Sequence, residues 1–146
     1  MLREITDCDL NQLLQLYKQL HNNTIPEQSE SLMQLWEKII TDRNRHIIVA
    51  EADERIVSSC ELVVIPNLTH QQRPYALIEN VITDENYRRQ GLATACLNFA
   101  REIAVSANCY KIMLLTGSKQ ESTLRFYENA GYNQNDKTAF VQWLNP

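Results

Sequence analysis

The chain has 146 residues, a formal net charge of −4, 44% hydrophobic residues and 22% charged residues, a balance typical of one globular domain, residues 1–146. The excess of acid disfavours nucleic acid as the main partner, because nucleic-acid binding relies on a basic surface. No apolar run reaches the ~20 residues that a membrane span needs. The N-terminal stretch also lacks the apolar core of a secretion signal, so we expect a cytoplasmic protein. The acidic balance favours a neutral or cationic small molecule as its partner.

The cysteines indicate neither a disulfide framework nor a metal site. Cys8, Cys60, Cys96 and Cys109 are scattered without the paired C-x-x-C spacing that zinc sites and thiol pairs usually show. Cys60 and Cys96 stand among apolar neighbours and are predicted to be small core residues. The three histidines lie far apart in the sequence, so no cysteine–histidine nucleophile pair is inferred.

The first half of the chain predicts a strand, two helices and three further strands. Residues 2–5 form the first predicted strand, and Thr6 with Asp9 resembles a capping box for the helix that follows. Apolar residues at helical spacing predict helices over 10–20 and 32–40. HIIVAEA and IVSSCELVVI predict an antiparallel hairpin, and a proline-bounded loop leads to the strongly apolar strand YALIENVIT.

The second half predicts two more helices and two more strands. A long helix follows RRQG, with a buried stripe formed by Leu92, Cys96, Phe99 and Ile103. YKIMLL predicts a strand, Ser118 with Glu121 a capping box, and Gly131 a helix C-terminus. TAFVQWL (138–144) predicts a last strand. The alternation of strands and helices indicates an α/β protein with a mixed sheet and helices on its faces.

The segment NYRRQGLATACL places two arginines and a glycine at the start of the long helix. Free backbone N–H groups and the helix dipole make such a start an anion site. Gly91 lacks the Cβ that would obstruct a phosphate, while Arg88 and Arg89 add positive charge and hydrogen-bond donors. Neither the P-loop nor the dinucleotide fingerprint is present. On these residues alone, a diphosphate site and an ordinary solvated surface both remain open.

RRQGLA (88–93) resembles the R/Q-x-x-G-x-G/A signature of the GNAT superfamily of N-acetyltransferases. IENV, CYKIMLLTGS and RFYENAGY accompany it in the family's order and spacing, over residues 75–132. The chain is similar to small bacterial members and to glucosamine-phosphate acetyltransferases. The resemblance implies a single acetyltransferase domain with a central mixed, mostly antiparallel sheet of six to seven strands and about four helices on its faces.

The resemblance also implies the activity: transfer of an acetyl group from acetyl-CoA to a primary amine of a small molecule or peptide, directly in a ternary complex and without a metal. The backbone near Val81 or Ile82 would hydrogen-bond the thioester oxygen. Gln120 and Thr123 stand near a position where many members have an asparagine. The implied cofactor-binding residues are Val81, Ile82, Thr83, Arg88, Arg89, Gln90, Gly91, Leu92, Ala93, Thr94 and Thr123.

Glu79 is the candidate general base. It lies inside the apolar run YALIENVIT, where a poorly solvated carboxylate would be poised to accept a proton, directly or through a water. Strand alternation predicts that Glu79, Val81 and Thr83 share one face. The alternative is a structural glutamate that pairs with an arginine such as Arg73.

Tyr127 is the candidate general acid. Its spacing from Leu124 by itself indicates a core residue, whereas the resemblance implies that it protonates the CoA thiolate. Phe126 is predicted to pack. For the acceptor pocket, the resemblance implies the first two helices with their linker and the loop 65–75, which offer Tyr17, His21 and His70 as wall residues.

Three other interpretations stay open. The chain is an inactive CoA-binding sensor or interaction module, or it transfers the acyl group to oxygen, or it transfers another acyl group. By analogy with the family, residues 138–144 would serve a homodimer interface.

Overall fold

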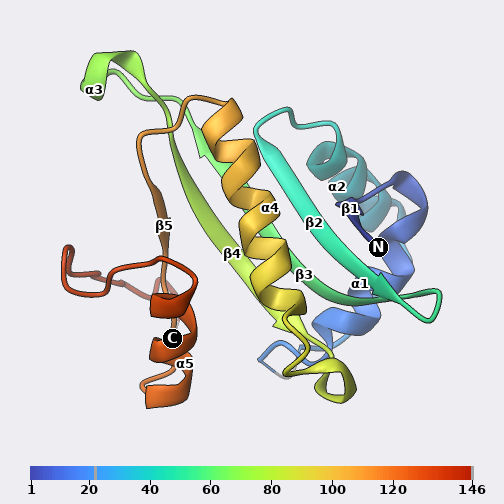
Figure 1. Cartoon of the computed structure of the whole chain (residues 1–146). Coiled ribbons are helices and arrows are strands. Elements are labelled where there is room, and N and C mark those ends of the chain that lie inside the picture. The colour runs from blue at the N-terminus through green and yellow to red at the C-terminus, as the bar shows by residue number, and fades with distance from the viewer. Residues whose placement is uncertain (22, 146) are drawn as a thin grey trace.

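A five-stranded sheet forms the centre of the molecule (Figure 1). The computed structural model describes residues 1–21 and 23–145. The strands are β1 (Leu2–Glu4), β2 (Arg45–Ala52), β3 (Arg55–Ile65), β4 (Tyr75–Thr83) and β5 (Ile112–Leu114), in this order across the sheet. β1 to β4 pair antiparallel, whereas β4 and β5 are parallel. The predicted α/β class and the mixed, mostly antiparallel sheet are confirmed.

The predicted number of six to seven strands is not confirmed. Residues 138–144, expected as the last strand, form no strand, and Phe140 and Trp143 are 92% and 80% exposed. A run of β-branched and aromatic residues forms a strand only where it packs and pairs with another strand. Residues 138–144 do not pair with the outer edge of β5, so the described residues contain five strands.

Helices cover both faces of the sheet (Figure 1), and the four longest in the described residues match the about four expected. α1 (Leu10–Tyr17) and α2 (Glu30–Ile40) lie on one face, α4 (Leu92–Ser106) on the other, and α5 (Glu121–Asn129) stands beside β5. The shorter turns are η1 (Asp7–Asp9), α3 (Thr69–Gln72) and η2 (Glu85–Tyr87). His70 and Gln71 in α3 have φ of 53° and 61°, so this element is a tight loop rather than a regular helix. No helix in the described residues is long and apolar enough to cross a membrane.

Two apolar cores hold these layers together. Under α4, Cys96 and Cys60 are fully buried, as predicted, and pack with Ile78 of β4. Under α1 and α2, Leu13 and Trp36 pack against the opposite face of the sheet. The sheet is therefore buried on both faces, which explains why β3 consists almost wholly of buried residues.

Strand β4 contains a β-bulge at Asn80 and Val81. Its register with β3 shifts between the pairs Glu61↔Glu79 and Ser59↔Ile82, and Asn80 has a left-handed φ of 51°. Ile78 belongs to the core under α4, whereas Ile82 belongs to the core under α1 and α2. An extra residue in one strand reverses its alternation. The prediction that Glu79 shares a face with Val81 and Thr83 is therefore wrong.

The parallel pairing of β4 is short. β5 pairs with β4 only from Ala76↔Ile112 to Ile78↔Leu114, although β4 continues to Thr83. Beyond Ile78, the edge of β4 that faces β5 has no strand partner in the described part of the chain. The two strands separate in the direction of α5 and the start of α4 (Figure 1).

Asp9 ties β1, β2 and the first helical turn together. Its carboxylate accepts hydrogen bonds from the Thr6 N–H at 2.6 Å and from Arg3 Nη1 and Nη2 at 2.6 and 2.9 Å, and Arg3 also donates to Glu51 of β2. Thr6 and Asp9 form the predicted capping box. The Arg3 guanidinium beside Asp9 holds the pKa of that carboxyl at about 2.

This lowered pKa predicts a loss of stability in acid. Native Asp9 resists protonation more than the unfolded residue, whose pKa is 3.8, so stability is present above about pH 4 and falls as the pH decreases toward 2. We expect Asp9→Asn to lower the free energy of unfolding at pH 7 by about 2 kcal/mol. It should also flatten the dependence between pH 4 and 2, measured by urea denaturation at each pH. An equally steep dependence in Asp9→Asn would contradict this assignment.

Candidate active site

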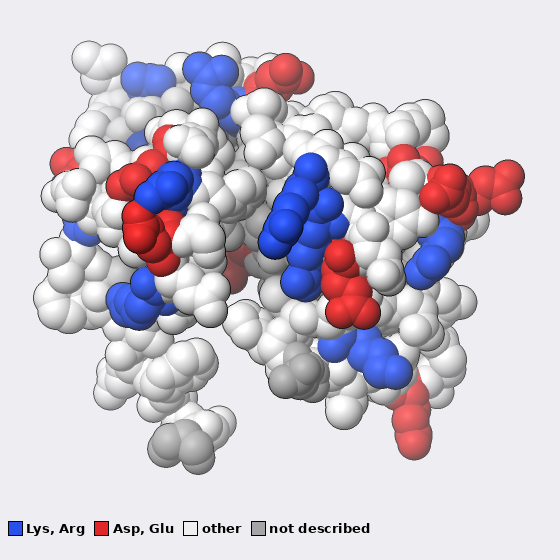
Figure 2. Space-filling model, turned by 60° about the horizontal axis from the view of Figure 1, so that its bottom comes forward, with Lys and Arg blue, Asp and Glu red and all other residues white. Residues whose placement is uncertain are grey.

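A cavity of about 490 Å³ lies where β4 leaves β5, between the start of α4 and α5. Figure 2 views the corresponding end of the molecule and shows basic side chains at the edge of a hollow. The volume is in the range of small-molecule sites. Its lining residues are Val81, Ile82, Thr83, Tyr87, Arg88, Arg89, Gly91, Leu92, Ala93, Thr94, Ser122, Thr123, Phe126 and Tyr127.

The cavity brings together residues that the sequence separates by some 45 positions. Of the residues expected to bind the cofactor, only Gln90 is not part of the lining. Tyr127 lines the cavity as well, whereas Glu79 does not. Tyr87 and Ser122 were not singled out from the sequence, because neither stands in a motif that marks it.

The start of α4 presents uncapped backbone donors to the cavity. Gly91 is the N-cap, no side chain caps the helix, and its first internal hydrogen bond runs from Ala95 N to Gly91 O at 2.9 Å. The N–H groups of Leu92, Ala93 and Thr94 precede that bond and have no partner within the helix. An anion placed there would satisfy them and would interact favourably with the helix dipole.

Gly91 is required by its backbone conformation. It has a φ of +77°, which disfavours side chains, and a Cβ built on it would meet no atom within 4 Å. The preceding Arg89 is also left-handed, with a φ of 61°. The glycine thus allows the sharp entry into α4 and leaves open space next to the free N–H groups.

Two positive charges beside these donors are not neutralised by the protein. Neither Arg88 nor Arg89 forms an ion pair among the described residues, and both are exposed. Arg88 Nε donates to the Thr83 carbonyl at 3.2 Å, so one of its donors is anchored to the end of β4. The guanidinium groups remain available to an anionic ligand.

α5 begins differently from the prediction. Its N-cap is Gln120 rather than Ser118. Ser118 Oγ instead accepts a hydrogen bond from the Gln120 N–H at 3.3 Å and donates one to Thr123 Oγ1 at 3.1 Å. The expected capping box with Glu121 is wrong because the hydroxyl satisfies the turn before the helix and the cavity-lining threonine.

The end of α5 fixes the position of Tyr127. Gly131 has a φ of 97°, as expected for a helix C-terminus. Its N–H donates to Glu128 O, and the Tyr132 N–H donates to Tyr127 O at 3.0 Å, which is the Schellman pattern. The rings of Tyr127 and Tyr132 then meet edge to face at 6.3 Å. Burial raises the pKa of Tyr127, so its hydroxyl stays protonated near neutral pH.

Glu79 lies on the other face of β4. It is exposed, so the poor solvation expected of a residue in an apolar run does not occur. The alternative pairing with Arg73 is also wrong, because Arg73 donates to the carbonyls of Asn108 and Cys109 at 3.1 Å each. Among the described residues Glu79 has no ion-pair partner, and its Cα is paired with that of Glu61 across the sheet.

Glu61 is the buried carboxylate of this region, and sequence reasoning missed it. It is 3% exposed, and its partners are Arg45 and Asn80. The signal was present, since Glu61 lies within the apolar run SSCELVVI just as Glu79 lies within YALIENVIT. Only the cover provided by the opposing helix layer distinguishes the two.

The three expected wall residues of the acceptor pocket are not brought together. Tyr17, the last residue of α1, is partly buried, and its hydroxyl is buried without a hydrogen-bond partner among the described residues. His21 is exposed. His70 stacks on Tyr110 at 3.8 Å at the end of β4 remote from α5 (Figure 1). Of the three, Tyr17 alone has a buried polar atom without a partner.

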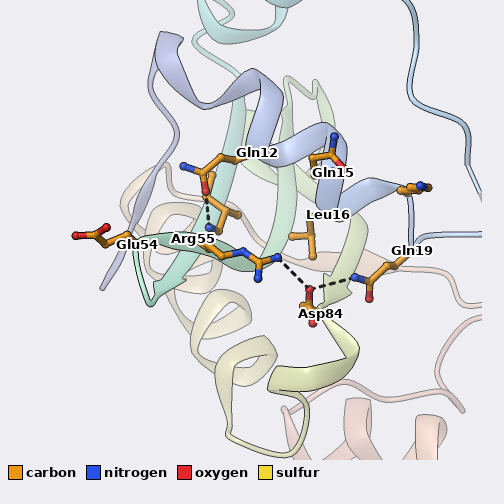
Figure 3. A pocket seen from close by; sticks show the side chains of 9 residues that line it. Gln12, Gln15, Leu16, Gln19, Glu54, Arg55 and Asp84 are labelled. Atoms are coloured by element: carbon orange, nitrogen blue, oxygen red, sulfur yellow. Dashed lines mark hydrogen bonds and ion pairs between the residues drawn. The ribbon is translucent and has the colours of Figure 1, made fainter.

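A second cavity, of about 370 Å³, lies between α1, β3 and the end of β4 (Figure 3). Its polar groups bond mainly to one another: Gln12 Oε1 accepts from Ile56 N at 2.8 Å, and Gln19 Nε2 donates to Asp84 Oδ2 at 3.1 Å. Asp84 precedes η2, which leads into the arginine loop. These contacts support the loop that carries the arginines. None of the predicted site residues lines the second cavity.

Comparison with known proteins agrees with this geometry. The sequence matches the acetyltransferase (GNAT) family over residues 10–132. It is 36% identical over 83 residues to the glucosamine 6-phosphate N-acetyltransferase of Trypanosoma brucei brucei, covering 57% of this chain and 54% of that protein. The chain spans about half the length of the curated relatives it matches.

Two solved structures are similar over almost their whole length. One, from Agrobacterium tumefaciens strain C58 and described as an acetyltransferase, has a TM-score of 0.89 at 34% identity, covering 98% of this chain and 99% of that one. The other, from Bacillus halodurans C-125 and described as a transcriptional regulator, has a TM-score of 0.85 at 28% identity with the same coverage. The family match, the strand separation and the uncapped helix start agree: the chain belongs to the GNAT family of acetyltransferases.

Proposed function

We propose that this chain is an acetyl-CoA-dependent N-acetyltransferase that transfers the acetyl group directly to a primary amine in a ternary complex. The observation that supports it is the shared cavity, in which an uncapped helix start with two unpaired arginines faces Tyr127 and the separated end of β4. Anion binding and acyl-transfer groups are thereby found within one site of suitable size.

The residues present fit acetyl-CoA. The N–H groups of residues 92–94, with Arg88 and Arg89, would hold the pyrophosphate. The pantetheine arm would run along Val81–Thr83, where the edge of β4 has no partner strand and its backbone groups need one. A backbone N–H near Val81, at the bulge, would donate to the thioester oxygen as negative charge develops there.

The reaction would need two proton transfers, one from the amine to Glu79 and one from Tyr127 to the sulfur, and these residues lie on opposite sides of the bulge. An alkylammonium must lose a proton before its nitrogen can attack the thioester carbon. Glu79 would accept that proton, and since its side chain lies outside the cofactor cavity, the transfer would pass through a water. Attack forms the C–N bond, and departure of the sulfur breaks the C–S bond.

Tyr127 would stabilise the departing sulfur. A free thiol has a pKa of about 8.5, below that of a phenol, so an ordinary thiolate would not take the whole proton. The same burial that raises the pKa of Tyr127 would disfavour a thiolate beside it. Hydrogen bonding to the sulfur, completed by proton transfer as charge accumulates, is then favourable.

The nature of the amine is open within this proposal. The relative from Trypanosoma brucei brucei is named for a phosphorylated amino sugar, and the acidic balance of this chain favours basic amines. A panel of amino sugars, polyamines, aminoglycosides and peptides with free amino groups, mixed with acetyl-CoA, tests the function through release of free thiol. Thiol release with one amine class supports it.

The second candidate is a CoA-binding module without catalysis. Two observations favour it: Glu79 lies outside the cavity, and one similar structure is described as a transcriptional regulator. CoA binding without thiol release from any amine of the panel would select this candidate.

We expect Tyr127→Phe to lower kcat about 100-fold, in the range of general acid catalysis. The dissociation constant of CoA should change less than about threefold, because the ring and its packing are retained. Steady-state kinetics and calorimetry measure the two. Tyr132→Phe is the matched control, since it removes a hydroxyl from the neighbouring ring of the same helix end. Normal turnover in Tyr127→Phe would exclude that residue from the mechanism.

We expect Arg88→Ala and Arg89→Ala each to weaken CoA binding about 5- to 10-fold, a magnitude appropriate to a charge-assisted hydrogen bond at an exposed site. Binding of pantetheine, which lacks the pyrophosphate, should not change. Arg125→Ala is the control, because Arg125 pairs with Glu121 on α5 and does not line the cavity. Unchanged CoA affinity in either cavity variant would remove that arginine from the site.

We further propose a homodimer in which residues 138–144 of each copy cover apolar surface of the other. Phe140, Val141, Trp143 and Leu144 are 92%, 60%, 80% and 83% exposed, and the outer edge of β5 has no strand partner among the described residues. An exposed apolar group of this kind marks an interaction surface. Light scattering should give twice the 17.0 kDa chain mass for the parent and a monomer for Phe140→Ser/Trp143→Ser. A monomeric parent would contradict the dimer.

A further inference from the structure

A polar network of the buried Glu61, the half-buried Arg45 and the exposed Asn80 lies at the bulge of β4 and belongs to neither cavity. Arg45 Nε donates to Glu61 Oε1 at 2.7 Å, and its Nη2 also donates to that oxygen. Asn80 Nδ2 donates to the other oxygen, Oε2, at 3.1 Å. Each carboxylate oxygen therefore has its own partner, one on β2 and one on β4.

Stability alone does not account for this network. A buried ion pair is often no better for stability than apolar side chains of the same volume, because both charges must leave water. Glu61 is itself 3% exposed, so an apolar residue would be compatible with the position. Burying this carboxylate costs free energy that an apolar side chain would not cost, so we expect its role to be in fixing a particular backbone conformation.

The conformation in question is that of Asn80. A left-handed backbone, with φ of 51°, is unfavourable for residues other than glycine, and asparagine tolerates it best. The register breaks at this residue, and Cys60 has no Cα partner in β4. The side-chain bond from Asn80 to Glu61 crosses from β4 to β3 where the backbone pairing is missing.

Tyr17 covers the network from α1. Its pKa is raised by burial and by the charge of the nearby Glu61, and its hydroxyl is inaccessible to solvent. The Glu61 carboxylate is thereby kept from water while Asn80 remains exposed, and a hydrogen bond to a carboxylate in such surroundings is stronger than one in water.

We infer that Glu61 is a positioning residue that acts through Asn80: it holds the β4 bulge in the conformation that presents Val81–Thr83 to the cofactor arm. This inference rests on the proposed function for its consequence, cofactor binding, but its structural part concerns the bulge alone. Arg45 neutralises Glu61 and orients the carboxylate toward Asn80.

The test is a paired exchange of carboxylate and amide. Asn80→Asp sets two carboxylates against each other in place of the 3.1 Å hydrogen bond. Glu61→Gln alone keeps the network, because an amide oxygen still accepts from Arg45 and Asn80 can turn its amide to accept from the new one. In Glu61→Gln/Asn80→Asp the amide and the carboxylate have exchanged places, and the hydrogen bond is restored.

We expect Asn80→Asp to raise the KM for acetyl-CoA and the dissociation constant of CoA about 10-fold or more. Glu61→Gln and the double variant should stay within about threefold of the parent, as expected for coupled neighbours. Glu51→Gln is the matched control, since Glu51 also pairs with an arginine, Arg3, but lies on β2 away from the bulge. Equal losses in Asn80→Asp and the double variant would overturn the inference.

Hydrogen exchange of residues 79–83 separates this inference from the proposed function. Asn80→Asp should accelerate exchange in that segment, and the double variant should reverse the change, whether or not CoA binds. If the parent binds no CoA, the proposed function fails while exchange still tests the network. If CoA binds but exchange in the segment is the same in all variants, Glu61 does not position the bulge.

Discussion

The interruption of pairing along β4 is the constraint on which the site depends. A central strand normally satisfies its backbone groups through both neighbours. After Ile78, β4 has lost its parallel partner on one side, and at Asn80 and Val81 its register breaks on the other. The end of the strand is thus held by its pairing with β3, which resumes at Ile82 and Thr83, while the other edge remains free among the described residues. The start of α4 and one side of α5 line the cavity at this free edge.

Because of the bulge, residues that are close in sequence on β4 lie on opposite faces of the sheet. Val81 faces the layer of α4, with the cavity, the arginines and Tyr127. Glu79 and Glu61 lie on the other face, where Glu79 is exposed and Glu61 is buried. In the proposed function, the helix start would bind the anionic cofactor, and the exposed Glu79 would receive a proton from the amine. For direct transfer, two substrates must approach one carbon from different directions, and a strand that changes face at that point would provide both approaches.

Most of the cavity lining could be predicted because its residues are nearly contiguous. Arg88 to Thr94 form one turn and one helix start, and glycine, arginine and free N–H groups there follow from local geometry. Tyr127 is distant, and its spacing alone indicated a core residue, so it was found only through the resemblance to a family. The surroundings of Glu79 and the grouping of the wall residues were predicted poorly: Glu79 is exposed, and His70 lies at the far end of β4. No local pattern states which helix will cover which strand.

Two carboxylates show what the sequence alone does not determine. Glu61 and Glu79 both lie within apolar strands, and the same argument applies to each from the sequence. The sequence by itself determined the features that depend on neighbours within a turn, such as the Thr6–Asp9 capping box, the entry into α4 at Gly91 and the Schellman end of α5 at Gly131. Their hydrogen bonds join residues a few positions apart, so the local chain is sufficient to specify them. Only the tertiary structure decided which carboxylate is buried, where β4 loses its partners and that residues 138–144 form no strand, because burial and strand pairing depend on groups from distant segments.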